Sequence, residues 1–143
     1  MARPLNITDK KISYSSIDDK DVIQFIRTIR NGISFVQFYS FARNAPFTMV
    51  EWAIFLNMSP RTMQRHQAEK KSFSSIYSER ILQITLLYNL GTEVFGEKEK
   101  FHTWLDTQNL AMGGIKPKEL LDNSFGIGMV KDELTRIEHG VLA

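Results

Sequence analysis

Residues 48–68 constrain the fold of this chain most, because their residue types fit two short helices joined by a tight turn. Ala53 lies midway along the first expected helix, where a second helix can approach closely only over a small side chain. Asn57 falls in the turn, where tolerance of a left-handed backbone is favoured. Ser59 and Pro60 then provide an N-cap and a first helical residue whose missing N–H costs nothing. The segment therefore predicts a helix-turn-helix.

The second of these helices would present a polar, basic face to solvent. Its inward residue is Met63, and the positions left facing outward are Arg61, Thr62, Gln64, Arg65 and Ala68. Side chains of these types bind phosphates and hydrogen-bond to base edges, so we expect the segment to bind DNA. The alternative is an αα-hairpin whose second helix is polar without a nucleic-acid partner. For the nearby Lys70, Lys71 and Arg80, contact with the DNA backbone and a solvated surface fit the sequence equally well.

Helical periodicity covers most of the remaining chain, and no segment shows the alternation typical of strands. Further helices are expected over residues 18–31, 34–45, 75–90, 97–108 and 124–139, with a short one from Pro117. The helix over residues 75–90 is so rich in apolar residues that several of its faces must be covered, which predicts a central position. Gly91 and Gly96 are expected to loosen the chain after it. The fold class is therefore expected to be all-α.

The composition fits a folded protein of the cytoplasm. With 143 residues, 43% hydrophobic and 24% charged, the chain can form one compact domain or two very small ones. It has no cysteine, no apolar leader, and no apolar run near the roughly 18 residues of a membrane helix. Residues 1–80 carry 12 Lys and Arg against 7 Asp and Glu, whereas residues 81–143 carry 6 against 9. A basic first half suits a partner that carries phosphates.

No pattern in the sequence supports catalysis. His66, His102 and His139 fall on different expected elements and lack the spacing of metal ligands. The sequence also lacks a phosphate-binding glycine loop and a G-x-S-x-G nucleophile motif. A partly exposed helix histidine is the ordinary explanation of His102. We therefore expect a protein that is not an enzyme and that uses no metal and no cofactor.

The C-terminal third carries residues that local physics explains one at a time. Gly113-Gly114 favours a tight reversal, Gly126 close helix packing and Gly140 a helix end. The apolar residues expected in its core are Phe95, Phe101, Trp104, Leu120, Leu121, Val130, Leu134 and Ile137. The combination is more specific than its parts, because a longer set follows in a fixed order: Ser78-Glu79-Arg80, Phe95-Gly96, Trp104-Leu105, Asn109, Gly113-Gly114, Pro117, Leu120-Leu121, Gly126, Val130, Leu134, Arg136-Ile137 and His139-Gly140-Val141.

Together with the helix-turn-helix, this ordered set resembles the Xre/MbcA/ParS family of antitoxins over roughly residues 48–143. The resemblance implies that the second helix of the motif enters the major groove. The residues it implies for DNA contact are Arg61, Thr62, Gln64 and Arg65. The chain departs from the family pattern at Gln108, at Ile115 and at Asn123-Ser124, which leaves the identity of the partner open.

The resemblance also implies a division of the chain. It gives a flexible lead-in at residues 1–17, a helix-turn-helix domain at 18–90 and a small helical toxin-binding domain at 91–143. One recognition helix in each chain implies a homodimer on double-stranded operator DNA. The region around residues 18–43 offers a place for its interface.

The implied partner of the second domain is a toxin, often a RES-type enzyme that degrades NAD, whose active-site entrance the antitoxin occludes. The residues implied to bind it are Arg136, His139, Gly140, Val141, Leu142 and Ala143. The apolar tail at residues 141–143 suits such a surface, because chain ends are normally polar and frayed. Folding of the tail back onto its own module is the alternative.

Three functions fit these features. The first is a type II antitoxin that represses its own operon and neutralises a toxin. The second is a stand-alone repressor whose C-terminal module dimerises or senses a ligand. The third is a protein-interaction adaptor whose helix-turn-helix has lost its affinity for DNA.

Overall fold

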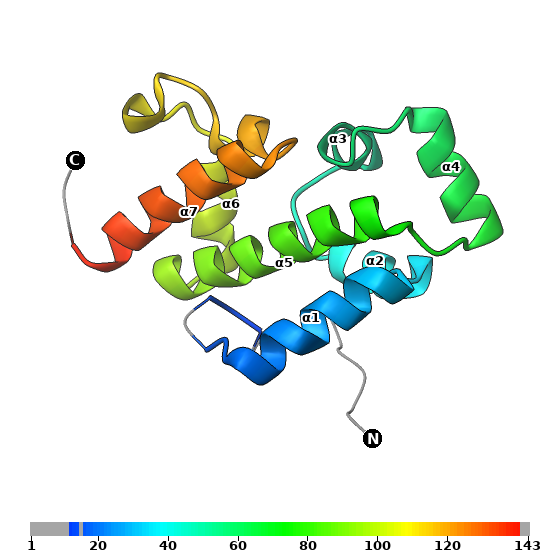
Figure 1. Cartoon of the computed structure of the whole chain (residues 1–143). Coiled ribbons are helices and arrows are strands. Elements are labelled where there is room, and N and C mark those ends of the chain that lie inside the picture. Colours follow the sequence, from blue (N-terminus) through cyan, green and yellow to red (C-terminus); the bar gives the residue numbers. More distant parts are fainter. Residues whose placement is uncertain (1–11, 15, 141–143) are drawn as a thin grey trace.

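The computed structural model describes residues 12–14 and 16–140, and within them it contains seven α-helices, two short 3₁₀ helices and no strand. The helices are α1 (Asp19–Asn31), α2 (Phe35–Ala42), α3 (Met49–Phe55), α4 (Pro60–Glu69), α5 (Ser75–Phe95), α6 (Lys98–Leu105), η1 (Leu110–Met112), η2 (Pro117–Leu120) and α7 (Ser124–Glu138). Figure 1 shows their arrangement. The expected all-α fold, a helix-turn-helix domain followed by a small helical domain, is confirmed.

The fold is built around α5, the longest helix. Helices α1, α6 and α7 all pack on it, with α1 and α7 on opposite sides in Figure 1. Its buried side chains, which include Ile81, Leu86 and Leu87, point in several directions around the helix axis. A helix that is apolar on more than one face must be covered on more than one face. The predicted central position of this helix is therefore confirmed.

The expected break after residue 90 is wrong, because α5 continues through Gly91 to Phe95. Gly91 is buried, and the ring of Phe101 on α6 occupies the space that a Cβ atom at this position would need. Glycine within a helix costs roughly 1 kcal/mol relative to alanine, and here it allows α6 to approach closely. The helix ends at Phe95, and its C-cap is Gly96, whose φ of 77° is left-handed. The expected boundary between residues 90 and 91 thus falls within α5.

Aromatic rings form the core of the first half. Trp52 is fully buried, and its ring lies 5.0 Å from Phe38, 5.9 Å from Phe41, 5.6 Å from Phe47 and 5.7 Å from Phe55, always close to edge-on. Edge-to-face contacts at these distances add to the stabilisation from burial. They fix α2 and the loop after it against α3.

Ser78 joins three parts of this half. Its buried hydroxyl accepts a hydrogen bond from the Ile33 N–H at 2.8 Å and donates one to the Phe73 carbonyl at 3.2 Å. Ile33 follows α1, and Phe73 lies in the connection from α4 to α5. One side chain on α5 therefore holds both loops in place.

Candidate DNA-binding and partner-binding surfaces

Local capping sets the positions of α3 and α4. The Thr48 hydroxyl accepts the N–H of Glu51 at 3.1 Å, and the Glu51 carboxylate accepts the N–H of Thr48 at 2.9 Å. Ser59 caps α4 by accepting the Thr62 N–H at 3.1 Å, with Pro60 as the first helical residue. The start of each helix is thus determined by its own residues.

The turn between the two helices has the predicted geometry. Asn57 adopts a left-handed backbone with φ of 56°, and the Met58 N–H donates to the Ala53 carbonyl at 3.0 Å. Ala53 is fully buried. The Asn57 side chain also donates to the Asp122 carbonyl at 3.2 Å, 65 residues further along the chain. This second contact ties the turn to the C-terminal module, and sequence reasoning missed it because nothing local signals it.

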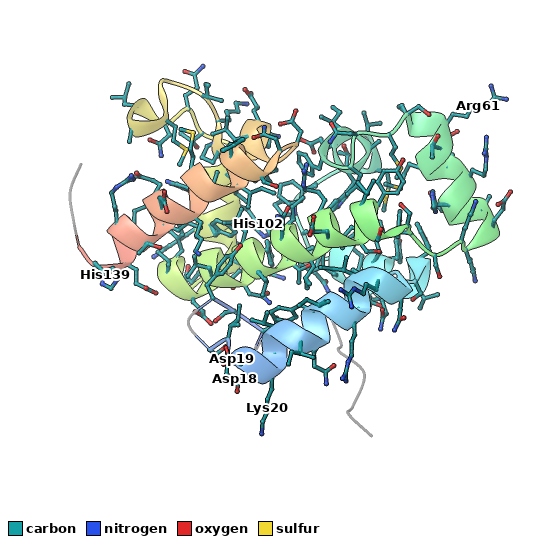
Figure 2. The ribbon with its side chains drawn as sticks, viewed as in Figure 1. Asp18, Asp19, Lys20, Arg61, His102 and His139 are labelled. Atoms are coloured by element: carbon teal, nitrogen blue, oxygen red, sulfur yellow. The ribbon has the colours of Figure 1, made fainter. Side chains whose placement is uncertain are left out.

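The α4 helix turns its polar face to solvent. Arg61, Gln64 and Arg65 are exposed, whereas Met63 is buried. Thr62 is half-buried, and its hydroxyl lies 3.0 Å from that of Ser59. Figure 2 shows Arg61 at one extremity of the molecule. Three of the four predicted DNA-binding side chains are therefore free to meet a nucleic acid, and the fourth lies at the cap beside them.

The charge around α4 is positive, and one basic residue near it has a structural role. Residues 60–71 contain one acidic residue, Glu69, and four basic residues: Arg61, Arg65, Lys70 and Lys71. Arg80 instead donates to the Phe55 carbonyl at the end of α3 at 3.0 Å and to Gln83 at 3.2 Å. Neither expectation for Arg80, DNA contact or simple solvation, describes this contact. Only the crossing of α5 past the end of α3 brings the two groups together.

The α7 helix carries an exposed stripe that the sequence analysis missed. Phe125 is 90% exposed and Met129 is 48% exposed, and the exposed Asp132 and Arg136 continue the same face. The buried face of α7 is formed by Gly126, Ile127, Val130, Glu133 and Leu134. The buried residues of α7 recur at intervals of three and four positions, and Phe125 and Met129 do not belong to that series. Their exposure could therefore have been predicted from the sequence.

The structure describes part of the predicted toxin-binding end. Arg136 pairs with Glu133, its Nη1 atom lying 2.9 Å from Oε2. His139 caps the end of α7 and Gly140 follows with φ of 69°, as expected for a helix terminus. Both are exposed. The predicted residues Val141, Leu142 and Ala143 lie outside the described residues.

Most of the core expected for this module is buried, but Ile137 is not. Phe101, Leu121, Val130 and Leu134 are buried, and Phe95, Trp104 and Leu120 pack partly buried against them. The expectation for Ile137 is wrong, since 37% of it is exposed. The C-terminal end of α7 projects beyond the end of α5 in Figure 1, and Ile137 lies in the last turn of α7.

A polar network joins the two modules. Lys118 lies 3.0 Å from Glu51 of α3 and 2.9 Å from Asp106, which Lys116 also contacts at 3.2 Å. Hydrogen bonds from Lys118 and Lys116 lower the pKa of Asp106, and those to Asp106 and Glu51 raise the pKa of Lys118. Partial burial acts to raise the pKa of Glu51, but hydrogen bonds from Thr48 and Lys118 bring it below its ordinary value.

A pocket of about 340 Å³ lies beside this network, at the junction of the modules. Its lining consists of Pro46, Phe47, His102, Thr103, Leu105, Asp106, Thr107 and Lys118. His102 lies 2.7 Å from the Tyr88 hydroxyl, and burial, followed by the charge of Lys98, lowers its pKa.

Among the described residues no group of three metal-binding side chains occurs. None of the helices in this part of the chain is long and apolar enough to cross a bilayer.

The fold, with an exposed basic face on α4 and an exposed apolar face on α7, is that of a helix-turn-helix protein. A second helical module packs on the same central helix, α5. Residues 24–85 match the model of the antitoxin Xre-like helix-turn-helix domain. Residues 90–140 match the model of the antitoxin Xre/MbcA/ParS C-terminal toxin-binding domain. The chain belongs to the Xre/MbcA/ParS family of antitoxins, as the resemblance in its sequence implied.

The chain is also similar to individual proteins that are named as antitoxins. The chain is 31% identical to an Xre antitoxin of Yersinia enterocolitica over 84 residues, which are 58% of this chain and 57% of the relative. It is 27% identical to an Xre antitoxin of Photorhabdus laumondii over the same shares. A Prs ADP-ribosylating antitoxin of a Sphingobium species is 29% identical over 97 residues, 62% of this chain and 61% of that protein. The chain thus matches little more than half the length of these relatives.

Proposed function

We propose that this protein is the antitoxin of a type II toxin-antitoxin system in the cytoplasm. In this proposal residues 18–90 bind the operator and so repress transcription of the protein's own operon. Residues 91–143 bind and neutralise a toxin enzyme of the RES type, which degrades NAD. The protein itself performs no catalysis. The observation that carries the proposal is that a basic exposed face on α4 and an apolar exposed face on α7 occur in one chain whose two parts match the two family models.

On DNA, we place α4 in the major groove. Arg61, Gln64 and Arg65 share one exposed face and would contact phosphates and base edges, with Thr62 beside them at the helix start. One chain offers a single recognition helix, so the operator-bound form is a homodimer.

At the other end, we place the toxin against α7 and the chain terminus. The predicted residues Arg136, His139 and Gly140 lie at the end of this surface, and Phe125 and Met129 extend it. The predicted residues 141–143 follow Gly140 in the sequence. Contiguous patches of exposed apolar side chains mark binding surfaces in folded proteins. Aromatic residues at the centre of such surfaces account for much of the binding energy.

A separation-of-function experiment tests the proposal. A gene for a RES-type enzyme from the same host is expressed from an inducible promoter, and growth is measured with each variant of this protein, while operator binding is measured by gel shift. Arg61→Ala with Arg65→Ala should abolish the gel shift and preserve growth. Phe125→Asp should preserve the gel shift and weaken neutralisation, with a toxin dissociation constant raised at least about tenfold. Operator binding that survives the double substitution would contradict the role of α4.

The stand-alone repressor is the second candidate, and the polar pocket of about 340 Å³ between the modules favours it. A repressor that senses a small ligand there would bind its operator fully without a second protein. Growth arrest by the RES-type enzyme that this protein fails to relieve, together with a normal gel shift, would favour this candidate over the antitoxin.

A further inference from the structure

Helix α1 has an apolar face that no described part of the chain covers. Its inner face rests on α5, with Phe25 buried. The side away from α5 exposes Val22 by 42%, Ile23 by 50% and Ile26 by 40%. Three branched apolar side chains in exposed positions within two turns of one helix form a hydrophobic patch, and such patches mark interaction surfaces.

Charged residues stand at both ends of this patch. Asp19, Ile23, Ile26 and Arg30 follow one another at intervals of four, three and four residues, so they line a single stripe along the helix. Asp19 lies in the acidic first turn and Arg30 in the last turn. Neither takes part in any of the ion pairs found within the described residues. Both charges therefore remain available to a partner.

The stripe is complementary to itself when reversed. Asp19 and Ile23 lie as far before its midpoint as Arg30 and Ile26 lie after it, with the two charges each about 8 Å from the midpoint at 1.5 Å of rise per residue. In two antiparallel copies, each Asp19 therefore faces an Arg30, and each Ile23 faces an Ile26. A two-fold interface requires such a self-complementary surface. Parallel packing would place like charges together at both ends.

We propose that α1 of one copy packs antiparallel against α1 of a second copy, and that this stripe is the dimer interface. The inference rests on the homodimer of the proposed function and adds its location. Two helices of about 20 Å in contact along their length bury well under the ~1,200 Å² of a standard interface. The dimer is therefore weak and concentration-dependent without DNA, and raising NaCl from about 50 mM to about 500 mM weakens it further by screening its exposed end pairs.

Charge exchange tests this interface on the full chain by sedimentation equilibrium. Asp19→Lys alone and Arg30→Glu alone each place like charges at both ends, so each should raise the dimer dissociation constant at least about tenfold. The double variant, Asp19→Lys with Arg30→Glu, restores opposite charges and should restore the dimer. An equimolar mixture of the two single variants should do the same, since each chain then supplies what the other lacks. Ile76→Glu, at a position on α5 that is 78% exposed, is the matched control and should dimerise as the wild type does.

The single variants keep the N-cap of α1, because Asp18 accepts the Asp21 N–H at 2.8 Å and is not changed. Circular dichroism checks that each remains helical. Single variants that dimerise like the wild type would overturn this interface and leave operator binding by a dimer formed elsewhere. A wild-type chain that stays monomeric at every concentration, with or without operator DNA, would overturn both this interface and the homodimer of the proposed function.

Discussion

Two glycines of α7 provide a matched test of the packing described here. Gly126 is buried, and a Cβ atom added to it would collide with the backbone carbonyl of Leu120 in η2. Gly128 lies two residues later in the same helix, and a Cβ atom there would meet no atom within 4 Å. The same substitution by alanine should therefore have opposite effects at the two positions.

The magnitudes follow from the surroundings. Alanine is favoured over glycine within a helix by roughly 1 kcal/mol, so Gly128→Ala should stabilise the protein by about that amount. At Gly126 the obstacle is backbone, which moves less readily than the end of a side chain, so Gly126→Ala should cost about 2–3 kcal/mol net. In a chain of this size these changes correspond to a rise in Tm of about 3 °C and a fall of about 6–10 °C.

Thermal unfolding followed by circular dichroism at 222 nm measures both variants, and urea unfolding converts the shifts into free energies. A Tm for Gly126→Ala equal to or above that of the wild type would refute the close approach of η2 to α7. A fall in Tm for Gly128→Ala would show that this face of α7 is covered.

Three further predictions concern the contacts between elements. Arg80→Ala should lower the free energy of unfolding by about 1–2 kcal/mol, because it leaves the last carbonyl of α3 without its donor, and urea titration would contradict this if the midpoint did not move. The folded-state pKa of Glu51 is lowered, so the contribution of this carboxylate to stability is present above its ordinary pKa of 4.5 and is lost as the pH falls through the lower folded value. Lys118→Met should therefore make the free energy of unfolding less sensitive to acid in that range. An unchanged pH profile of stability would be inconsistent with the ion pair. Trp52 lies in the first half of the chain and Trp104 in the second. In each of the single-tryptophan variants Trp52→Phe and Trp104→Phe, the urea midpoint measured by fluorescence should equal the midpoint measured by circular dichroism. Different midpoints by the two methods would mean that the halves unfold independently.

Local chemistry made part of the fold predictable from sequence. A cap such as Ser59 or a turn residue such as Asn57 acts on backbone groups within a few positions, so its effect can be inferred without the rest of the fold. Gly91 shows the limit, since the same residue type can mark a helix end or a close helix contact, and the ring of Phe101 that decides between them lies ten residues away. The Arg80 contact was hidden for the same reason.

The candidate surfaces were predictable to a similar extent. The outward face of α4 follows from the period of Met63 and the cap before it, both of which are local. The exposure of Phe125 depends on where α7 rests on α5, which the apolar period gives only in part. For Ile137 that period gave the wrong answer, because the residue lies in the last turn of α7, whose end projects beyond α5 in Figure 1.

The arrangement of the two surfaces bears on how the proposed functions combine. Helix α5 is a single uninterrupted helix of 21 residues, about 30 Å long. Arg61 of α4 and His139 at the end of α7 lie at opposite extremities of the molecule (Figure 2). A partner confined to either extremity therefore leaves the other extremity accessible. At the same time, contacts from Asn57 to Asp122 and from Lys118 to Glu51 fasten the helix-turn-helix to the C-terminal module. Under the proposed function, one chain can therefore bind operator and toxin together, and the module proposed to meet the toxin also supports the helices proposed to meet DNA.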